Sequence, residues 1–294
     1  MNGFINLLKP PGMSSGAAVA VVKRLTGEKV GHAGTLDPEA AGVLPIMVGR
    51  AARLLDYFAD KSKSYVAEIA FAGATDTQDA QGVIIENPTR VPEREEILAV
   101  LPAFRGEILQ RPPAYSALKR DGVPLYELAR KGVTVETKAR PTSIRSLELG
   151  EQTGPDGYML SVDCGSGTYI RTLCHDIGQA LDAPAHMRFL LRTRHGAFSI
   201  ENAVTVEEVM TAGEKHEIEN MLLPMDFPLQ PLPRLNLPER FWKLGKNGGK
   251  LPIGIMPEIQ ENQPIRVYAD NVLLGVAHKA DGIIRFDVGL TGGN

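Results

Sequence analysis

Residues 31–42 of this chain read GHAGTLDPEAAG, a glycine-rich stretch with Asp37 near its centre. Gly34 and Gly42 permit backbone angles and close approaches that a side chain would block. Pro38 restricts Asp37 to an extended conformation. The pattern therefore predicts an acid held at a fixed angle on a loop, where catalytic and binding groups are often positioned. The alternative is that Asp37 only caps a turn, as Asp before Pro does in many loops.

The composition is that of an ordinary globular protein. The chain has 294 residues, of which 43% are hydrophobic and 23% charged, enough for one large domain or a large and a small one. Because no run of about 18 apolar residues and no basic-then-apolar leader occurs, we expect neither a membrane span nor secretion. Cys164 and Cys174 are too few for a metal or disulfide framework, so we expect both to be reduced in a cytoplasmic core.

The charge is unevenly distributed along the chain. Its net value of −3 argues weakly against a nucleic-acid partner. However, residues 105–145 carry nine Lys or Arg against four acids, and residues 186–196 carry Arg188, Arg192 and Arg194 with no acid. Fields within a Debye length of about 10 Å matter more to a polyanion than the global sum. Both stretches are therefore candidate RNA-facing surfaces, unless they are simply solvated faces.

Hydrophobic periodicity predicts strands and helices that are mixed without regular βαβ alternation. Strands are expected at 4–8, 65–71 and 158–164 from their apolar runs and alternation. Ser14 or Ser15 can cap a helix that should end at Gly27, and Thr205 with Glu208 forms a capping box for another. This mixture favours an α+β fold built on a mixed sheet. Further helices are expected at 50–58, 92–100, 124–132 and from about 168.

Five prolines between residues 224 and 238 predict a stiff linker. We therefore expect a catalytic domain over residues 1–225 and a second domain over residues 235–294. The second should be β-rich, with strands at 265–269, 271–278 and 283–288 and a hairpin turn at Asp270-Asn271.

Four further motifs accompany the Asp37 stretch. They read GFINLLKPPGMSS at 3–15, KSY at 63–65, RPPAYSALK at 111–119 and GSGTYIRTL at 165–173. In this order and spacing they closely resemble the TruB-type tRNA pseudouridine synthases of bacteria, over about 220 residues. The resemblance implies a mixed-sheet catalytic domain followed by a PUA-like RNA-binding domain. It also implies isomerisation of uridine 55 in the T arm of tRNA by base flipping, with no cofactor and no metal.

The same resemblance implies three catalytic residues. Asp37 matches the family's catalytic aspartate, and Arg171 matches the arginine that pairs with it, orients it and keeps it ionised. Tyr65 matches the tyrosine that stacks on the target base, although the face it shares with Ile69 and Phe71 leaves a core role open. Whether Asp37 attacks the sugar, attacks the base or takes a proton cannot be deduced from the sequence.

Other residues are implied to contact the RNA. Tyr169 and Leu191 match the wall of the base pocket, with a core role as the alternative for each. His32 matches a histidine that enters the space left by the flipped base, although a lone histidine can also be structural. Lys9 and Pro10 match a motif that supports the catalytic loop. Residues 105–140 match an RNA-clasping insertion whose candidate phosphate contacts are Lys119, Arg120, Arg130, Lys131, Lys138 and Arg140.

Three other functions are compatible with parts of this pattern. A synthase of the same superfamily could act on ribosomal RNA, although the long basic extensions that would favour this are absent from the sequence. A non-catalytic protein could bind tRNA and remodel its elbow. A carboxylate-dependent hydrolase usually needs two acids, and only Asp37 has a matching motif. We expect a monomer with tRNA as its partner, no membrane association and no obligate protein partner.

Overall fold

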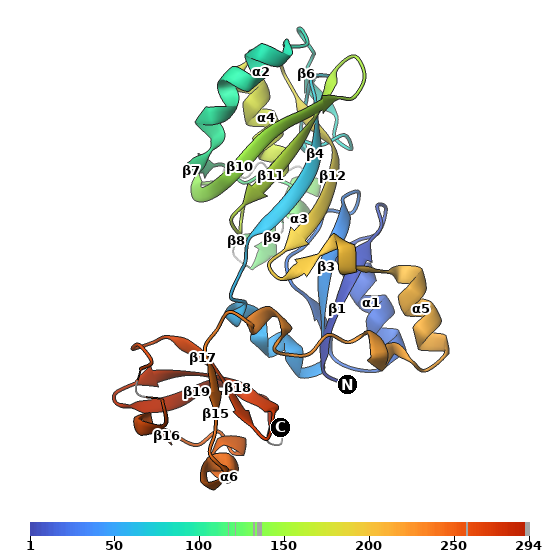
Figure 1. Ribbon diagram of the computed structural model, residues 1–294. Helices are drawn as coiled ribbons and strands as arrows, with labels where there is room; N and C mark the ends of the chain where they lie inside the picture. Colours follow the sequence, from blue (N-terminus) through green and yellow to red (C-terminus); the bar gives the residue numbers. More distant parts are fainter. Residues whose placement is uncertain (117, 121, 132, 134–136, 257, 292–294) are drawn as a thin grey trace.

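The computed structural model describes the chain except residues 117, 121, 132, 134–136, 257 and 292–294, and the side chains of Lys119 and Arg130. Ten of the described strands form one long sheet, which runs through the upper two thirds of Figure 1. Its order is β14-β1-β3-β12-β4-β11-β10-β7, with β2 on β3 and β13 on β12. The strands are β1 (Gly3–Lys9), β2 (Val30–His32), β3 (Ala41–Val48), β4 (Lys63–Ala70), β7 (Gly106–Gln110), β10 (Arg140–Gln152), β11 (Gly157–Cys164), β12 (His186–His195), β13 (Phe198–Ser199) and β14 (Val204–Thr205).

The sheet is mixed, as predicted. β1 runs parallel to β14 and β12 runs parallel to β3, while the other neighbours are antiparallel. In the parallel pair, Leu191 lies opposite Ala41 and Arg192 opposite Gly42. Since Ala41 follows the Asp37 loop directly, this pairing places the loop at the junction of β3 and β12, near the middle of the sheet.

Two helices pack together beside the β14 edge of this sheet (Figure 1). α1 (Ser15–Thr26) is capped by the Ser14 hydroxyl, which accepts a hydrogen bond from Ala17 N at 3.1 Å, and it ends at a left-handed Gly27. α5 (Val206–Glu214) begins with the predicted capping box between Thr205 and Glu208. Both predictions are confirmed, because each depends only on residues close in sequence.

The opposite end of the sheet is covered by α4 (Ile170–Ala180) and α2 (Arg94–Val100), which contact each other. α4 starts two residues later than predicted. The helix predicted at 50–58 is a 3₁₀ helix, Gly49–Tyr57, and not an α-helix. The predicted 124–132 helix is observed as α3 (Leu125–Arg130), beside the short hairpin of β8 (Lys119–Arg120) and β9 (Val123–Pro124). A second hairpin joins β5 (Ala74–Thr75) to β6 (Ile84–Glu86).

A separate five-stranded sheet forms the lower part of Figure 1, in the order β15-β17-β18-β19-β16. Its predicted hairpin turn is confirmed: Asp270 and Asn271 have φ values of 50° and 60°, and Ala269 pairs with Val272. Together with the mixed main sheet, this small β-rich unit confirms the predicted fold class. Its elements are β15 (Arg234–Asn236), β16 (Leu251–Pro252), β17 (Pro264–Ala269), β18 (Val272–Ala280), β19 (Ile283–Gly289) and α6 (Trp242–Lys246).

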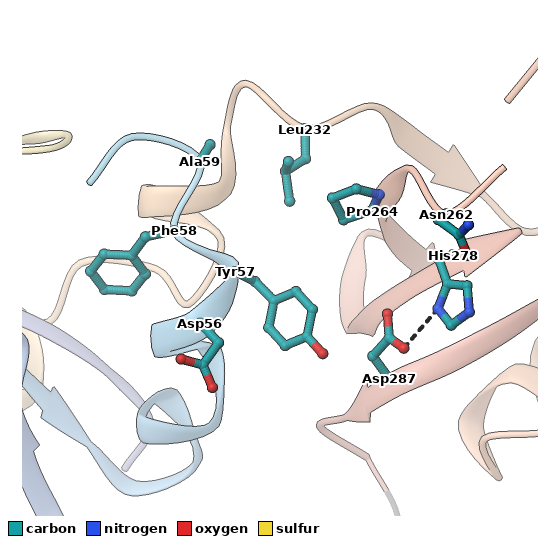
Figure 2. A pocket seen from close by; sticks show the side chains of 9 residues that line it. All are labelled: Asp56, Tyr57, Phe58, Ala59, Leu232, Asn262, Pro264, His278 and Asp287. Carbon is teal, nitrogen blue, oxygen red and sulfur yellow. Dashed lines mark ion pairs between the residues drawn. The ribbon is translucent and has the colours of Figure 1, made fainter. Parts of the chain in front are cut away.

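The proline-rich segment between the two sheets is packed against both. Leu229 is fully buried and the Phe227 ring lies 5.2 Å from that of Phe198. Arg53 Nη1 donates to Gly289 O at 2.9 Å, and Tyr268 donates its hydroxyl hydrogen to the Asp226 carboxylate at 2.5 Å. A cavity of about 460 Å³ lies at this junction, lined by Tyr57, Leu232, His278, Asp287 and five other residues (Figure 2).

Two further expectations concern the cysteines and membrane-spanning segments. Cys164 and Cys174 are both buried and free. Among the helices that the structure describes, all are too short or too polar to cross a membrane.

Candidate active site

The loop between β2 and β3 carries Asp37, and buried side chains fix its main chain. The Lys9 ammonium donates to Pro38 O at 2.9 Å and also to Pro10 O and Met13 O. Ser15 Oγ both donates to Leu36 O and accepts from Leu36 N, each at 2.9 Å. Burial lowers the pKa of Lys9 to about 8. Lys9 thus ties the Asp37 loop, through Pro38 O, to the segment after β1, through Pro10 O and Met13 O, which fits the supporting role implied by the resemblance.

Two glycines at the ends of the loop are required by the space around them. Gly34 has a φ of 74°, and Gly42 has a φ of 118°. A Cβ on Gly42 would lie 2.2 Å from Arg192 O, so β12 could not approach β3 with any other residue there. The predicted need for glycine at these two positions is therefore explained by backbone angle and by close packing.

The Asp37 carboxylate is paired with Arg171 at the start of α4. Arg171 Nε lies 3.0 Å from Asp37 Oδ2, and Nη2 donates to Oδ1 at 3.2 Å. The Arg171 side chain is 6% exposed, whereas that of Asp37 is 36% exposed. This is a bidentate ion pair in which the arginine is buried and the carboxylate is accessible to solvent. The described contacts of the Asp37 side chain are with Arg171, so the carboxylate does not act as a turn cap.

Arg171 is itself held by three separate segments. Besides Asp37, it donates to Thr77 O at 3.2 Å and to Tyr115 O at 2.9 Å, and it lies 3.7 Å from the Asp79 carboxylate. Sequence reasoning missed the contributions of Thr77, Tyr115 and Asp79. The sequence of residues 76–82, DTQDAQG, indicates a polar loop, and nothing in it indicates that the loop folds against Arg171.

Tyr65 is buried beneath the same loop. Its side chain is 7% exposed and belongs to the main hydrophobic cluster, together with Ile69 and Phe71. Burial raises the pKa of Tyr65 to about 12, and the neighbouring Arg192 charge partly opposes this. Tyr65 is therefore a core aromatic, as the alternative predicted, and its stacking on the target base stays a prediction.

His32 and Leu191 flank the loop. His32 ends β2, is half-buried, and has a buried Nδ1 without a partner among the described residues. Burial and then the Arg192 charge lower its pKa below the usual value. Leu191 is half-buried and pairs with both Ala41 and Val66, so it sits where β3, β12 and β4 meet.

Tyr169 lies further along, directly before α4. Its main chain exchanges two hydrogen bonds with the Gln110 side chain, at 3.0 and 3.3 Å. Burial raises the pKa of the Tyr169 hydroxyl above its usual value. Tyr169, Gln110 and Arg140 are among the residues that line a cavity of about 240 Å³.

Pro10 is half-buried beside the Asp37 loop, and its carbonyl oxygen accepts a hydrogen bond from Lys9.

The two basic stretches differ in their surroundings. In residues 186–196, Arg192 is fully buried, Arg188 is paired with Glu68 and Asp156, and Arg194 is paired with Asp163. The expectation of a surface position is wrong for Arg192, which is buried, and acids distant in sequence pair with Arg188 and Arg194. Contact of this stretch with RNA stays a prediction.

In residues 105–140 the exposed cations include Lys131, Lys138 and Arg140. Arg120 is also exposed, and it has an interaction within the protein. The side chains of Lys119 and Arg130 lie outside the described part. Both ends of this segment belong to the main sheet, because Gly106–Gln110 form its edge strand β7 and Arg140 begins β10.

Two further titratable side chains, Lys63 and His195, lie next to Gly34 of the loop. Burial, then the Arg192 charge, lowers the pKa of Lys63 to about 8. Burial, Arg192 and Lys63 together lower the pKa of His195 to about 2. Within the described residues, no group of three or more His, Cys, Asp or Glu side chains converges as metal ligands would.

Two family models match consecutive parts of the chain. Residues 23–170 match the N-terminal domain of the TruB family pseudouridylate synthases. Residues 171–230 match the tRNA pseudouridylate synthase B C-terminal domain. The chain belongs to the TruB family.

Individual relatives extend over almost the whole chain. A tRNA pseudouridine synthase B of Alkaliphilus oremlandii is 40% identical, over 97% of this chain and 94% of that protein. A protein of the same name from Heliobacterium modesticaldum is 47% identical, over 74% of this chain and 72% of that one. Among solved structures, a chain of an H/ACA RNP bound to a substrate RNA containing 2'-deoxyuridine superposes with a TM-score of 0.74. It is 25% identical and covers 99% of this chain and 85% of its own.

Proposed function

We propose that this protein converts uridine 55 in the T arm of tRNA to pseudouridine. The observation that carries the proposal is the Asp37–Arg171 pair, in which a buried arginine presents an accessible carboxylate on an immobilised loop. The names of the relatives, tRNA pseudouridine synthase B, support tRNA as the substrate. The reaction breaks the N1–C1' bond, turns the uracil and forms a C5–C1' bond. A proton leaves C5 and N1 gains one, so no redox partner is required.

In this proposal Asp37 acts on the detached uracil or its sugar as an ionised nucleophile or base. Arg171 orients it, and the buried face of the pair leaves only one side open to the substrate. Tyr65 forms the floor against which the flipped base rests, while Tyr169 and Leu191 form the wall. His32 fills the space that the base vacates. Base–aromatic contacts of this kind contribute about 1–3 kcal/mol each.

The RNA would extend from the loop across residues 105–140. The exposed cations Lys131, Lys138 and Arg140 support this path. We further propose that residues 1–225 form the catalytic domain and residues 235–294 a PUA-like RNA-binding domain. We also propose that the protein acts as a cytoplasmic monomer.

The decisive experiment measures tritium release from a T-arm stem-loop RNA labelled at C5 of the target uridine. Wild type should release tritium, and Asp37→Ala should fall below detection while still binding the RNA. Glu39→Gln, an exposed acid two residues away, is the matched control and should stay within about threefold of wild type. Tight binding without release by wild type would favour an RNA-binding role, and release by Asp37→Ala would remove Asp37 from the mechanism.

A further inference from the structure

The Arg192 guanidinium is fully buried and reaches both ends of the Asp37 loop. Nε donates to Val43 O at 2.7 Å, and Nη2 donates to Gly34 O at 3.0 Å. Nη1 lies 3.5 Å from Thr35 O. Residues 34 and 35 precede Asp37 and residue 43 follows it, so one planar group spans the two ends of the loop.

The main chain of Arg192 contacts the loop as well. Arg192 pairs with Gly42 in the parallel register of β12 and β3, at a separation that admits no side chain on Gly42. The backbone of Arg192 therefore fixes the end of the loop at Gly42. Its side chain bonds to Gly34 O at the other end of the loop and to Val43 O just after Gly42.

The same residue lies next to Tyr65. The two are directly opposite each other in the antiparallel register of β12 and β4. The positive charge of Arg192 lowers the pKa of Tyr65, against the larger effect of burial. Arg192 is thus in contact with both the loop that carries Asp37 and the aromatic ring beneath it.

We propose that Arg192 is a positioning residue for the isomerisation, fixing the Asp37 loop and Tyr65 in one mutual geometry. The inference rests on the proposed function of the site. Arginine suits this role because its planar fork offers several donors in fixed directions, whereas lysine offers one flexible ammonium. Burying a charge against carbonyls costs free energy unless its donors are satisfied. An aliphatic side chain would fill the same volume without that cost, so the guanidinium is explained by its directed contacts.

The test compares Arg192→Lys and Arg192→Met with Arg188→Lys, a matched control. Arg188 lies on the same strand but is paired with Glu68 and Asp156. The measurements are the single-turnover rate of tritium release, the Kd for the stem-loop RNA and the melting temperature. Because a displacement of about 1 Å can cost about 100-fold in rate, we expect a loss of that order for Arg192→Lys. The Kd should change less than about threefold, and Arg188→Lys should keep the wild-type rate.

Each other result counts against the proposal. A folded Arg192→Lys with a rate within about threefold of wild type would overturn it. So would a rate that falls in step with RNA affinity, or an equal loss in Arg188→Lys, because both indicate general destabilisation. Failure of both Arg192 variants to fold would assign the residue to the core alone. If wild type itself releases no tritium, the proposed function fails first and takes this inference with it.

Discussion

The Asp37 loop and the C-terminal sheet are held in place by different forces. Around the loop, Lys9, Ser15 and Arg192 make directed hydrogen bonds to main-chain atoms. In the C-terminal sheet, the strands close over an apolar cluster that includes Leu274 and Val267. Directed bonds fix the position of particular atoms, whereas apolar burial stabilises a region without specifying positions so finely. Changes near the loop should therefore affect chemistry, and changes in the cluster should affect stability.

The sharpest test of this difference is Arg171→Ala. It leaves Asp37 unpaired and removes the donors to Thr77 O and Tyr115 O. Breaking a buried ion pair costs about 3–5 kcal/mol, which, if lost in full from the transition state, corresponds to a loss of roughly two to four orders of magnitude in rate. Single-turnover tritium release measures it. Near-normal turnover would show that the pair does not hold the carboxylate for the reaction.

The complementary change is Leu274→Ala in the C-terminal cluster. Leu274 is fully buried, so the truncation should lower the free energy of unfolding by about 2–5 kcal/mol. Urea denaturation measures the loss, and the rate of the folded variant should remain within about twofold of wild type. A fall in rate with intact folding would mean that the two regions are coupled, and that the comparison is too simple.

The buried Lys63 predicts a specific pH dependence of stability. Its pKa is lowered to about 8 in the fold, from a usual 10.5, so the unfolded chain binds more protons between these values. Its destabilising effect is complete below pH 8 and is relieved as the pH rises from about 8 to 10.5. One pKa unit corresponds to about 1.4 kcal/mol, so the gain is at most about 3 kcal/mol.

Urea midpoints of wild type and Lys63→Met at pH 7.5, 8.5 and 9.5 isolate this effect from other titrating groups. Wild type should gain stability relative to the variant over this range. Lys61→Met, whose parent side chain is on the surface, should behave like wild type. Parallel curves for wild type and Lys63→Met would place the lysine in a better solvated environment.

The smallest expected effect concerns the RNA-facing cations. Replacing Lys119, Arg130 and Lys131 together by Gln should flatten the salt dependence of stem-loop binding. Each lost phosphate contact removes roughly 0.7–0.9 from the slope of log K against log salt. Lys215→Gln, beyond the opposite edge of the main sheet, is the control. If the triple variant kept the wild-type slope, the path of the RNA across this segment would be wrong.

The parts of the fold that the sequence predicted well depend on neighbouring residues. The Ser14 cap, the Thr205 capping box and the Asp270-Asn271 turn each need only three or four consecutive residues. The predicted pairing of Asp37 with Arg171 is also present, but it came from a family resemblance and not from a local signal. Its catalytic meaning remains a prediction.

The parts that were missed depend on contacts between distant segments. Arg192 was interpreted as surface charge, because its partners Gly34 and Val43 lie about 150 residues earlier. The contact of Asp79 with Arg171 could not be predicted for the same reason, because Arg171 lies on α4 and is distant in sequence. A charged residue in a single sequence looks the same whether it faces water or main-chain carbonyls.

The separation of 158 residues between Gly34 and Arg192 also sets when the site can come into existence. A ribosome adding about 5–20 residues per second needs roughly 8–30 s to go from one to the other. Throughout that interval the nascent chain already carries Asp37, but β3 has no β12 beside it and the loop has no clamp. Contacts of such long range are slow to form. The Asp37 site can therefore form only late in the synthesis of the chain, after most of the main sheet has been made.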